Sequence, residues 1–253
     1  MTLGLHSPKL DAVRDLLTKR GRRDHGRYTV EGATMLSEAL AAGIEPEAIY
    51  VTSAGLAGLP GAARPLHERL FEVPDRAMAR ISDLEAPPGI VAVFPITLTP
   101  LDMLLGAGHR AVVLAGVSDP GNAGTLMRSA EIFGLPGVVF LAAAVEPHNP
   151  KVVRASMGAI FRLDLAVAKP DDISTAAERH GYTVVAAAQD GEPLPGFRFP
   201  ERSLIAIGHE RRGVAEWLPR YDRAVAIPQR GRGESLNAAV AGGIIFYAFS
   251  QQV

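Results

Sequence analysis

The sequence predicts an α/β fold around a parallel sheet, and two observations carry this prediction. In the later part of the chain, short apolar runs alternate with segments of helical pattern, as in chains that wind strands and helices by turns. Within each run the hydrophobic residues are continuous, which is typical of parallel strands covered on both faces. The runs are Ala111–Val117, Gly137–Ala142, Phe161–Val167, Tyr182–Ala187, Ser203–Ile207 and Ala224–Ile227.

The first part of the chain has shorter elements and predicts a small α/β domain. Residues 28–44 predict a short strand, a glycine turn and a helix, and Glu45–Thr52 predicts another strand. Arg64–Glu72 passes from a helical pattern into a strand, and Ala86–Phe94 combines a Pro-Pro-Gly break with a β-rich run. We therefore expect an N-terminal domain over residues 1–94.

The segment 95–108 predicts the boundary between two domains. It contains Pro100 and two glycines, and its pattern is typical of a loop. We expect a linker there and an α/β domain over residues 109–253.

Composition excludes several classes of protein. Of the 253 residues, 47% are hydrophobic and 21% are charged, enough for a sizeable core. Lys and Arg number 26 against 27 Asp and Glu, so the net charge is −1, which excludes a uniformly basic coat but not a local basic patch. The absence of cysteine excludes disulfides, thiolate metal sites and cysteine nucleophiles. Without a secretory signal or an apolar stretch near the ~20 residues that span a bilayer, we expect a cytoplasmic protein with no membrane partner.

Residues 7–27 form a basic arm. Between Lys9 and Arg27 the sequence has seven Lys or Arg residues against three Asp residues. One interpretation is a solvated amphipathic helix, and the other is an arm that attracts phosphates. The apolar face of such a helix would hold Leu10, Val13, Leu16 and Leu17. The arginines that would contact a nucleic acid are Arg20, Arg22 and Arg23.

Common nucleotide-binding and hydrolase motifs are missing from the chain. No G-x-G-x-x-G follows the first strand of the α/β part, and there is no Walker A lysine, H-E-x-x-H or G-x-S-x-G. The seven histidines have no ligand-like spacing, so we expect no metal.

Three clusters follow predicted strands, at the strand ends where open α/β sheets place their ligands. They are DPGNAGTLMRSAEIFG (119–134), LIAIGHERRGV (204–214) and IPQRGRGESLNAAVAGGIIFY (227–247). In the first, Asn122 or Thr125 is expected to cap a helix that carries Arg128. In the third, Ser235 is expected to cap a helix with adjacent glycines, which cost ~1 kcal/mol each and so imply close packing. Each cluster alone also fits a purely structural interpretation. The first could be a capped helix with a surface arginine, the second a charged glycine turn, and the third a buried helix.

Taken together, the three clusters resemble, in order and separation, the three motifs of the SpoU/TrmH branch of SPOUT RNA methyltransferases. A fourth block, NPKVVRASMGAIFRL (149–163), resembles the segment between the family's first two motifs. The resemblance runs from about Val112 to the C-terminus. Upstream, YTVEGATMLSEAL and SDLEAPPGIVAVF resemble the small substrate-binding domain that precedes many members.

This resemblance implies S-adenosylmethionine-dependent methylation of a ribose 2′-hydroxyl in ribosomal or transfer RNA. It also implies a deep trefoil knot, an exception to the usual absence of knots, and a homodimer with the cofactor near its interface. The positions that match the family's catalytic residues are Asn122, Arg128, Glu210, Ser235 and Asn237. The positions that match its cofactor-binding residues are Ile207, Gly208, Ile227 and Leu236. Arg154, in the fourth block, is expected to contact RNA with the arginines of the arm.

Two positions depart from the family pattern. His209 stands where members often have a small or amide residue, and we expect a loop histidine with a backbone hydrogen bond. The run Gln229–Arg232 stands where members often show Met, small residues and Gly.

The chemistry suits the residues that the resemblance selects. The ribose hydroxyl is a poor nucleophile, so the site must align it with the methyl group and stabilise the negative charge that develops on its oxygen. Arg128 is expected to do this as an electrostatic clamp, because a guanidinium does not give up its proton in a protein. Glu210 is expected either to fix that arginine or to hold a backbone turn.

Two rival functions remain open at this point. One is an RNA-binding protein that kept the knotted fold and lost catalysis, which the complete set of matching residues disfavours. The other is a small-molecule α/β enzyme, which the extra N-terminal domain and the basic arm disfavour.

Overall fold

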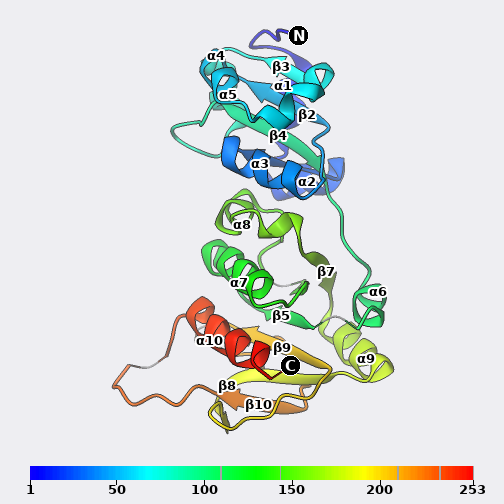
Figure 1. Ribbon diagram of the computed structural model, residues 1–253, viewed down its shortest axis with the longest axis vertical. Coiled ribbons are helices and arrows are strands. Elements are labelled where there is room, and N and C mark those ends of the chain that lie inside the picture. Colours follow the sequence, from blue (N-terminus) through cyan, green and yellow to red (C-terminus); the bar gives the residue numbers. More distant parts are fainter. Residues whose placement is uncertain (109, 143, 210, 234, 253) are drawn as a thin grey trace. The chain divides into compact units, whose positions relative to one another are not determined.

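The computed structural model describes residues 1–108, 110–142, 144–209, 211–233 and 235–252. The chain forms two compact units (Figure 1). The first contains Met1–Thr97 together with His148–Phe161, a segment from much later in the sequence. The second contains Leu98–Pro147 and Arg162–Val253. Among the described residues, no helix is both long and apolar enough to cross a membrane.

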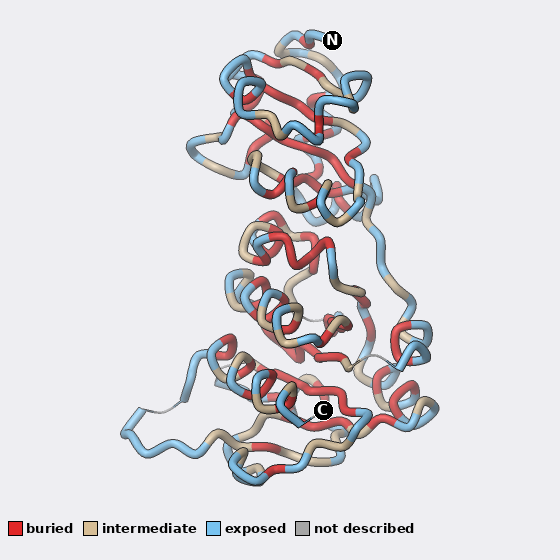
Figure 2. Tube along the Cα trace, viewed as in Figure 1, coloured by how far each residue is buried: buried red, intermediate tan, exposed pale blue. Residues whose placement is uncertain are grey.

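The second unit is built on a six-stranded sheet in which every strand pairing is parallel, so the α/β prediction is confirmed. The strand order is β10-β8-β9-β5-β6-β7. The bounds are β5 Ala111–Ala115, β6 Gly137–Leu141, β7 Asp164–Ala168, β8 Thr183–Pro193, β9 Ser203–Gly208 and β10 Arg223–Ala226. Strands β5, β6 and β9 are buried at every position, as their unbroken apolar runs predict (Figure 2).

Helices cover both faces of this sheet. The helices of the second unit are α6 Leu101–Gly106, α7 Pro120–Ile132, α9 Pro170–His180 and α10 Ala238–Ser250. Helices α6 and α9 pack on one face, in a core that includes Leu105, Val113 and Ile173. Helices α7 and α10 pack against each other, and α10 also packs against β9.

Three local expectations for this unit are corrected. The segment 95–108 is not all loop, because Leu104 and Leu105 bury their side chains and support α6. Helix α7 is capped by Asp119, not by Asn122 or Thr125, because the Asp119 carboxylate accepts from the backbone N–H of Asn122 at 2.7 Å. Helix α10 is capped by Asn237, not by Ser235.

The first unit has a four-stranded mixed sheet in the order β1-β4-β2-β3. Its strands are β1 Arg27–Glu31, β2 Ala48–Val51, β3 Leu70–Glu72 and β4 Ile90–Pro95, where the β-rich runs predict them. Its helices are α1 Pro8–Asp15, α2 Lys19–His25, α3 Ala33–Ala41, α4 Ser53–Ala57, α5 Asp75–Ile81, α8 Pro150–Ala155 and the 3₁₀ helices η1 Gly61–Arg69 and η2 Ala159–Phe161.

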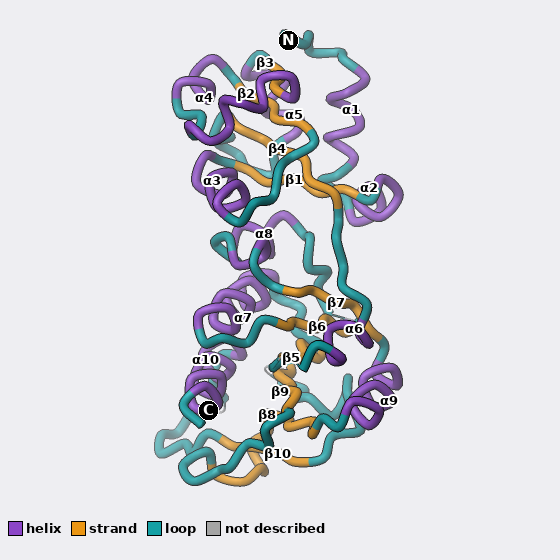
Figure 3. Tube along the Cα trace, turned by 45° about the vertical axis from the view of Figure 1, so that its right-hand side comes forward, coloured by secondary structure: helices purple, strands orange, loops and turns teal. Residues whose placement is uncertain are grey.

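The basic arm is two helices, not one (Figure 3). The first ends at Asp15, and Thr18 caps the second, since its hydroxyl accepts from the backbone N–H of Gly21 at 3.0 Å. The expected apolar face is confirmed at Leu10, Val13 and Leu16, which are buried, whereas Leu17 is only partly buried.

The segment His148–Phe161 completes the core of the first unit. Its first residue lies against Tyr28, with ring centroids 4.6 Å apart, and its last lies 5.6 Å from the ring of Phe94. Helix α8, between them, packs on β1. Burial, together with the nearby Arg22 guanidinium, lowers the pKa of His148 to about 4.

Candidate active site

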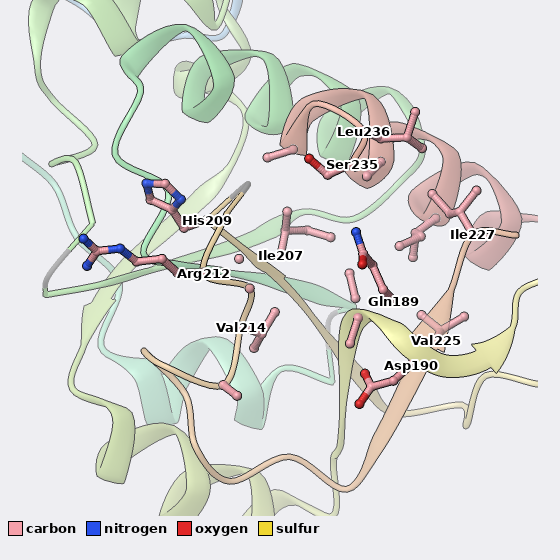
Figure 4. A pocket seen from close by; sticks show the side chains of 18 of the residues that line it. Gln189, Asp190, Ile207, His209, Arg212, Val214, Val225, Ile227, Ser235 and Leu236 are labelled. Atoms are coloured by element: carbon pink, nitrogen blue, oxygen red, sulfur yellow. The ribbon is translucent and has the colours of Figure 1, made fainter. Parts of the chain in front are cut away.

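A cavity of about 400 Å³ lies in the second unit at the carboxyl ends of β8, β9 and β10 (Figure 4). The start of α10 closes its other side. The second and third motif clusters both contribute to its wall, so the sequence-predicted placement at the strand ends is confirmed for these two. Its volume lies within the range of roughly 300–1,000 Å³ that small-molecule sites usually have.

All four positions predicted to bind the cofactor line this cavity. They are Ile207, Gly208, Ile227 and Leu236. Only glycine fits at position 208, because a Cβ atom there would lie 2.3 Å from the carbonyl carbon of Gly213. The loop therefore turns back tightly on the end of β9, and backbone groups form this part of the wall.

The loop after β9 is held by its own hydrogen bonds. The backbone N–H of Gly213 donates to the carbonyl of His209 at 2.8 Å, and that of Arg211 donates to His209 Nδ1 at 3.1 Å. The expected backbone hydrogen bond of His209 is thus present, and in the neutral ring the hydrogen lies on Nε2. Arg212 pairs with Glu216 at 2.9 Å. Glu210, predicted to be catalytic, lies outside the described residues.

Helix α10 brings two of the predicted catalytic residues together. Asn237, not Ser235, is its N-cap, because the Asn237 Oδ1 atom accepts from the N–H groups of Ala239 and Val240 at 2.9 and 3.2 Å. The Asn237 amide nitrogen donates to Asn122 Oδ1 at 3.0 Å, across 115 positions of sequence. Ser235 precedes the helix and lines the cavity (Figure 4).

Arg128 lies elsewhere. It projects from the middle of α7, is exposed, and does not line the cavity. The structure of one chain therefore unites Ser235 with the cofactor-binding positions and Asn122 with Asn237, but it does not bring Arg128 to the cavity.

The surface formed by α7 and α10 holds a groove of about 600 Å³, lined by Asn122 and Asn237 among others. The two helices approach closely at Gly242. A Cβ atom there would lie 2.2 Å from a methyl carbon of Leu126, so this approach requires glycine. This contact explains one of the two adjacent glycines in the third cluster. Large apolar side chains are exposed on these helices: Ile132, Val240, Ile244 and Tyr247.

The arginines predicted to contact RNA differ in exposure. Arg20 and Arg23 are exposed and share Asp24, each at 3.3 Å. Arg22 is only 3% exposed, and its guanidinium donates to the carbonyl of Leu16 at 2.7 Å, so it is not available to a phosphate at the surface. Arg154 is partly buried and lies 3.5 Å from Asp83.

Two polar residues of β8 that line the cavity were missed by the sequence reasoning. Gln189 and Asp190 follow the apolar part of β8, directly after the run Tyr182–Ala187, and both line the cavity. The rule that ligands bind at the carboxyl ends of parallel strands would have selected them. Asp190 is the one carboxylate among the described lining residues.

The cavity is suited to S-adenosylmethionine. Val214, Val225 and Ile245 give it apolar walls for an adenine ring, and the backbone of the tight loop offers hydrogen-bonding groups. Asp190 supplies a negative charge for a ligand with a sulfonium and an ammonium group. Over the described ranges, no group of three or more His, Asp or Glu residues is placed to hold a metal ion.

Comparisons with known proteins agree with this geometry. The SpoU rRNA Methylase family matches residues 109–247, and the MRM3-like substrate binding domain matches residues 7–92. A 23S rRNA (uridine(2479)-2′-O)-methyltransferase of Streptomyces viridochromogenes is 31% identical over 194 residues, which cover 73% of this chain and 68% of that protein. A 23S rRNA (guanosine(2553)-2′-O)-methyltransferase of Bacillus subtilis is 26% identical over 249 residues, 96% of this chain and 97% of that protein.

Solved structures show the same likeness over the whole chain. The SpoU methyltransferase AviRb of Streptomyces viridochromogenes, in complex with the cofactor AdoMet, has a TM-score of 0.85 and 26% identity, and 98% of each chain is covered. An rRNA methyltransferase of Sinorhizobium meliloti has a TM-score of 0.86 and 25% identity, covering 100% of this chain and 98% of that one. The chain thus belongs to the SpoU rRNA methylase family, the S-adenosylmethionine-dependent RNA 2′-O-ribose methyltransferases.

Proposed function

We propose that this protein methylates a ribose 2′-hydroxyl of ribosomal RNA, in the cytoplasm. The observation that carries the proposal is that the four predicted cofactor-binding positions, which come from two separate motif clusters, line one cavity at the strand ends. The two 23S rRNA methyltransferases described above support ribosomal RNA as the substrate class. They also make an inactive RNA-binding protein the less favoured alternative.

The cavity residues bind and orient the methyl donor. When bound, S-adenosylmethionine supplies a methyl group on a positively charged sulfur. Position 208 admits no Cβ atom, and the hydrogen bonds from the backbone N–H groups of Gly213 and Arg211 to His209 hold the backbone here before the ligand arrives. The apolar walls exclude water, which favours a reaction in which charge is neutralised.

Asn122, Asn237 and Arg128 act on the acceptor ribose. The linked amides of Asn122 and Asn237 have donors and acceptors suited to a ribose hydroxyl or a phosphate oxygen. Arg128 keeps its proton and stabilises the negative charge that develops on the 2′-oxygen. The proton of the hydroxyl passes to phosphate or water. Glu210 fixes Arg128 or the turn that it belongs to.

Arg128 reaches the donor in a homodimer. One chain leaves Arg128 away from the cavity, and its α7–α10 surface combines the 600 Å³ groove with exposed apolar side chains. A second copy packed on this surface by two-fold symmetry would bury those side chains and place the arginine of one copy near the cavity of the other. We also propose that the C-terminal part of the chain forms a deep trefoil knot.

RNA contacts extend to the first unit. Arg20, Arg23 and Arg154 are the arginines that we assign to phosphates, whereas the burial of Arg22 removes it from the predicted set. The match to a substrate-binding domain over residues 7–92 supports this role for the first unit.

The test is methyl transfer to unmodified ribosomal RNA. The protein is incubated with labelled S-adenosylmethionine and a 23S rRNA transcript, and the product is digested and mapped by mass spectrometry. We expect a single 2′-O-methylated nucleotide. Binding of the donor in calorimetry without any methylated ribosomal nucleotide would contradict the substrate class, and absence of donor binding would restore the inactive alternative.

A further inference from the structure

The first unit contains two cavities of different character. One, of about 290 Å³, lies between α1 and the sheet, and the other, of about 490 Å³, lies beside α4, α5 and the turn at 87–89. The polar part of the smaller is lined by Lys9, His25 and Arg27 and by one carboxylate, Glu47. Of the described residues that line the larger, Asp75 alone is charged, so that cavity offers nothing to a phosphate. By charge, only the smaller cavity suits RNA.

The floor of the smaller cavity is aromatic and apolar. The rings of Tyr50 and Phe71, on neighbouring strands β2 and β3, stack with centroids 5.4 Å apart and planes 24° from parallel. Both side chains are almost fully buried, and both line the cavity. The remaining apolar wall is formed by Ala12, Val13, Leu16, Ala48 and Val93. A volume near 290 Å³ accommodates one planar base, not a longer stretch of nucleic acid.

Positive charge gathers at the rim. The Lys9 ammonium lies 4.2 Å from the centroid of the Phe71 ring, and within the described part of the chain no carboxylate pairs with it. Arg27 forms an ion pair with Glu47, and His25 lies 3.7 Å from Asp15. The Lys9 side chain is exposed, so its ammonium is available to an anion.

The positive charge continues along α2. This helix ends at His25 on the rim and carries exposed Lys19, Arg20 and Arg23. Single-stranded RNA is commonly bound in this way, with unstacked bases on aromatic surfaces and the backbone along cations.

We propose that this cavity binds one unstacked nucleotide of the substrate RNA, with its base against the Tyr50–Phe71 floor and its phosphate beside Lys9. The proposal rests on the proposed function, since it takes ribosomal RNA as the ligand. It adds a site in the first unit, separate from the donor cavity, that selects a single-stranded region of the target.

The first test changes charge at the rim. Lys9→Ala is compared with Arg76→Ala, which removes an exposed cation on α5 next to Asp75 of the other cavity. The probe is a 23S rRNA transcript, and affinity is measured across a range of salt concentrations. We expect Lys9→Ala to weaken binding three- to tenfold and to reduce the salt slope by about 0.7–0.9, the loss of one phosphate contact. An equal loss of affinity in Arg76→Ala would mean that binding depends on the overall positive charge of the unit and not on this cavity, and it would overturn the proposal.

The second test fills the cavity without changing charge. Ala12→Trp, and the smaller change Ala12→Leu, place bulk at the wall formed by α1. With folding checked by thermal melting, we expect a higher KM for the transcript and an unchanged kcat, to a greater degree for tryptophan. Unchanged KM in both variants would show that no base enters the cavity. Saturable binding of AMP alone, measured by calorimetry and abolished by Ala12→Trp, would assign the cavity to a free nucleotide instead of RNA.

These results are separable from the proposed function. If the wild-type protein transfers no methyl group but binds the transcript, and the Lys9 and Ala12 variants weaken that binding as expected, the proposed function fails and the nucleotide site stands. If methyl transfer occurs and the Lys9 and Ala12 variants behave as wild type, the nucleotide site fails and the methyltransferase stands.

Discussion

The cavities of the two units are built in opposite ways. The donor cavity of the second unit is formed by the ends of buried parallel strands and by loops so tight that Gly208 admits no side chain. The rim of the cavity in the first unit is formed by exposed side chains on α1 and α2. The first kind of site should respond to changes in bulk and backbone, and the second to changes in charge and salt. The predictions below test this contrast.

The largest effect is expected from Arg128→Ala, which removes charge stabilisation of the transition state. We expect kcat for ribosomal RNA to fall by about 10²–10³, as for loss of an oxyanion donor. The affinity for S-adenosylmethionine should change far less than kcat, because the role proposed for Arg128 is to stabilise charge on the 2′-oxygen of the RNA and not to hold the donor. Single-turnover methyl transfer and calorimetry measure the two quantities, with Arg220→Ala as an exposed control. Near-normal turnover with bound RNA would reject the role of Arg128.

Bulk at the donor cavity comes next. Gly208→Ala places a Cβ atom 2.3 Å from the Gly213 carbonyl carbon, so the loop must move. We expect the Kd for S-adenosylmethionine to rise about a hundredfold, equivalent to ~2.7 kcal/mol. The matched control is Gly231→Ala, since no atom lies within 4 Å of a Cβ at that position. Equal affinities in the two variants would show that the tight loop does not form the donor site.

Acid should weaken the first unit more than the second. The pKa of His148 is lowered to about 4 by burial and by Arg22, so folding holds the ring neutral. Its stabilisation is complete above the unfolded pKa of about 6.5 and is lost as the pH falls toward 4. Between pH 7 and pH 5 we expect a loss of ~2 kcal/mol in the free energy of unfolding. The loss should be absent in His148→Gln, which chemical denaturation at each pH would reveal; equal pH dependence in both proteins would argue against a buried neutral ring.

The smallest effect separates two neighbouring arginines. Arg23→Ala should weaken binding of a 23S rRNA transcript two- to threefold and reduce the salt slope by about 0.7–0.9, because Arg23 is exposed. Arg22→Ala should instead lower the free energy of unfolding by ~1–3 kcal/mol, since it leaves the Leu16 carbonyl without its donor. Filter binding and thermal melting distinguish the two. A larger loss of RNA affinity in Arg22→Ala than in Arg23→Ala, with unchanged melting, would reverse the assignment.

Much of the fold could be predicted because it depends on local pattern, whereas the four positions expected to bind the cofactor came from the family resemblance and line one cavity. Unbroken apolar runs specify buried parallel strands, and motif order specifies the loops at their ends. The burial of Arg22 could not be predicted. The seven basic residues among the 19 residues of segment 9–27 look equally solvated until their tertiary neighbours are known. Helix α6 was missed for a related reason: Leu104 and Leu105 stabilise it through contacts with the core, not through a strong helical pattern.

The homodimer, in which a second copy would cover the α7–α10 surface, depends on groups beyond one chain and stays a prediction. The domain boundaries, the knot and the assigned catalytic roles also stay predictions. His209 shows the opposite case, since a loop histidine bonded to nearby backbone follows from its immediate sequence surroundings and is what the structure contains.

The inclusion of His148–Phe161 in the first unit means that neither unit is a single stretch of chain. A fragment ending at Thr97 would leave the rings of Tyr28 and Phe94 without the partners that cover them. Grafting the first unit onto a different protein therefore requires two transplanted pieces, and a hybrid made by one cut and one splice is expected to leave these two rings uncovered.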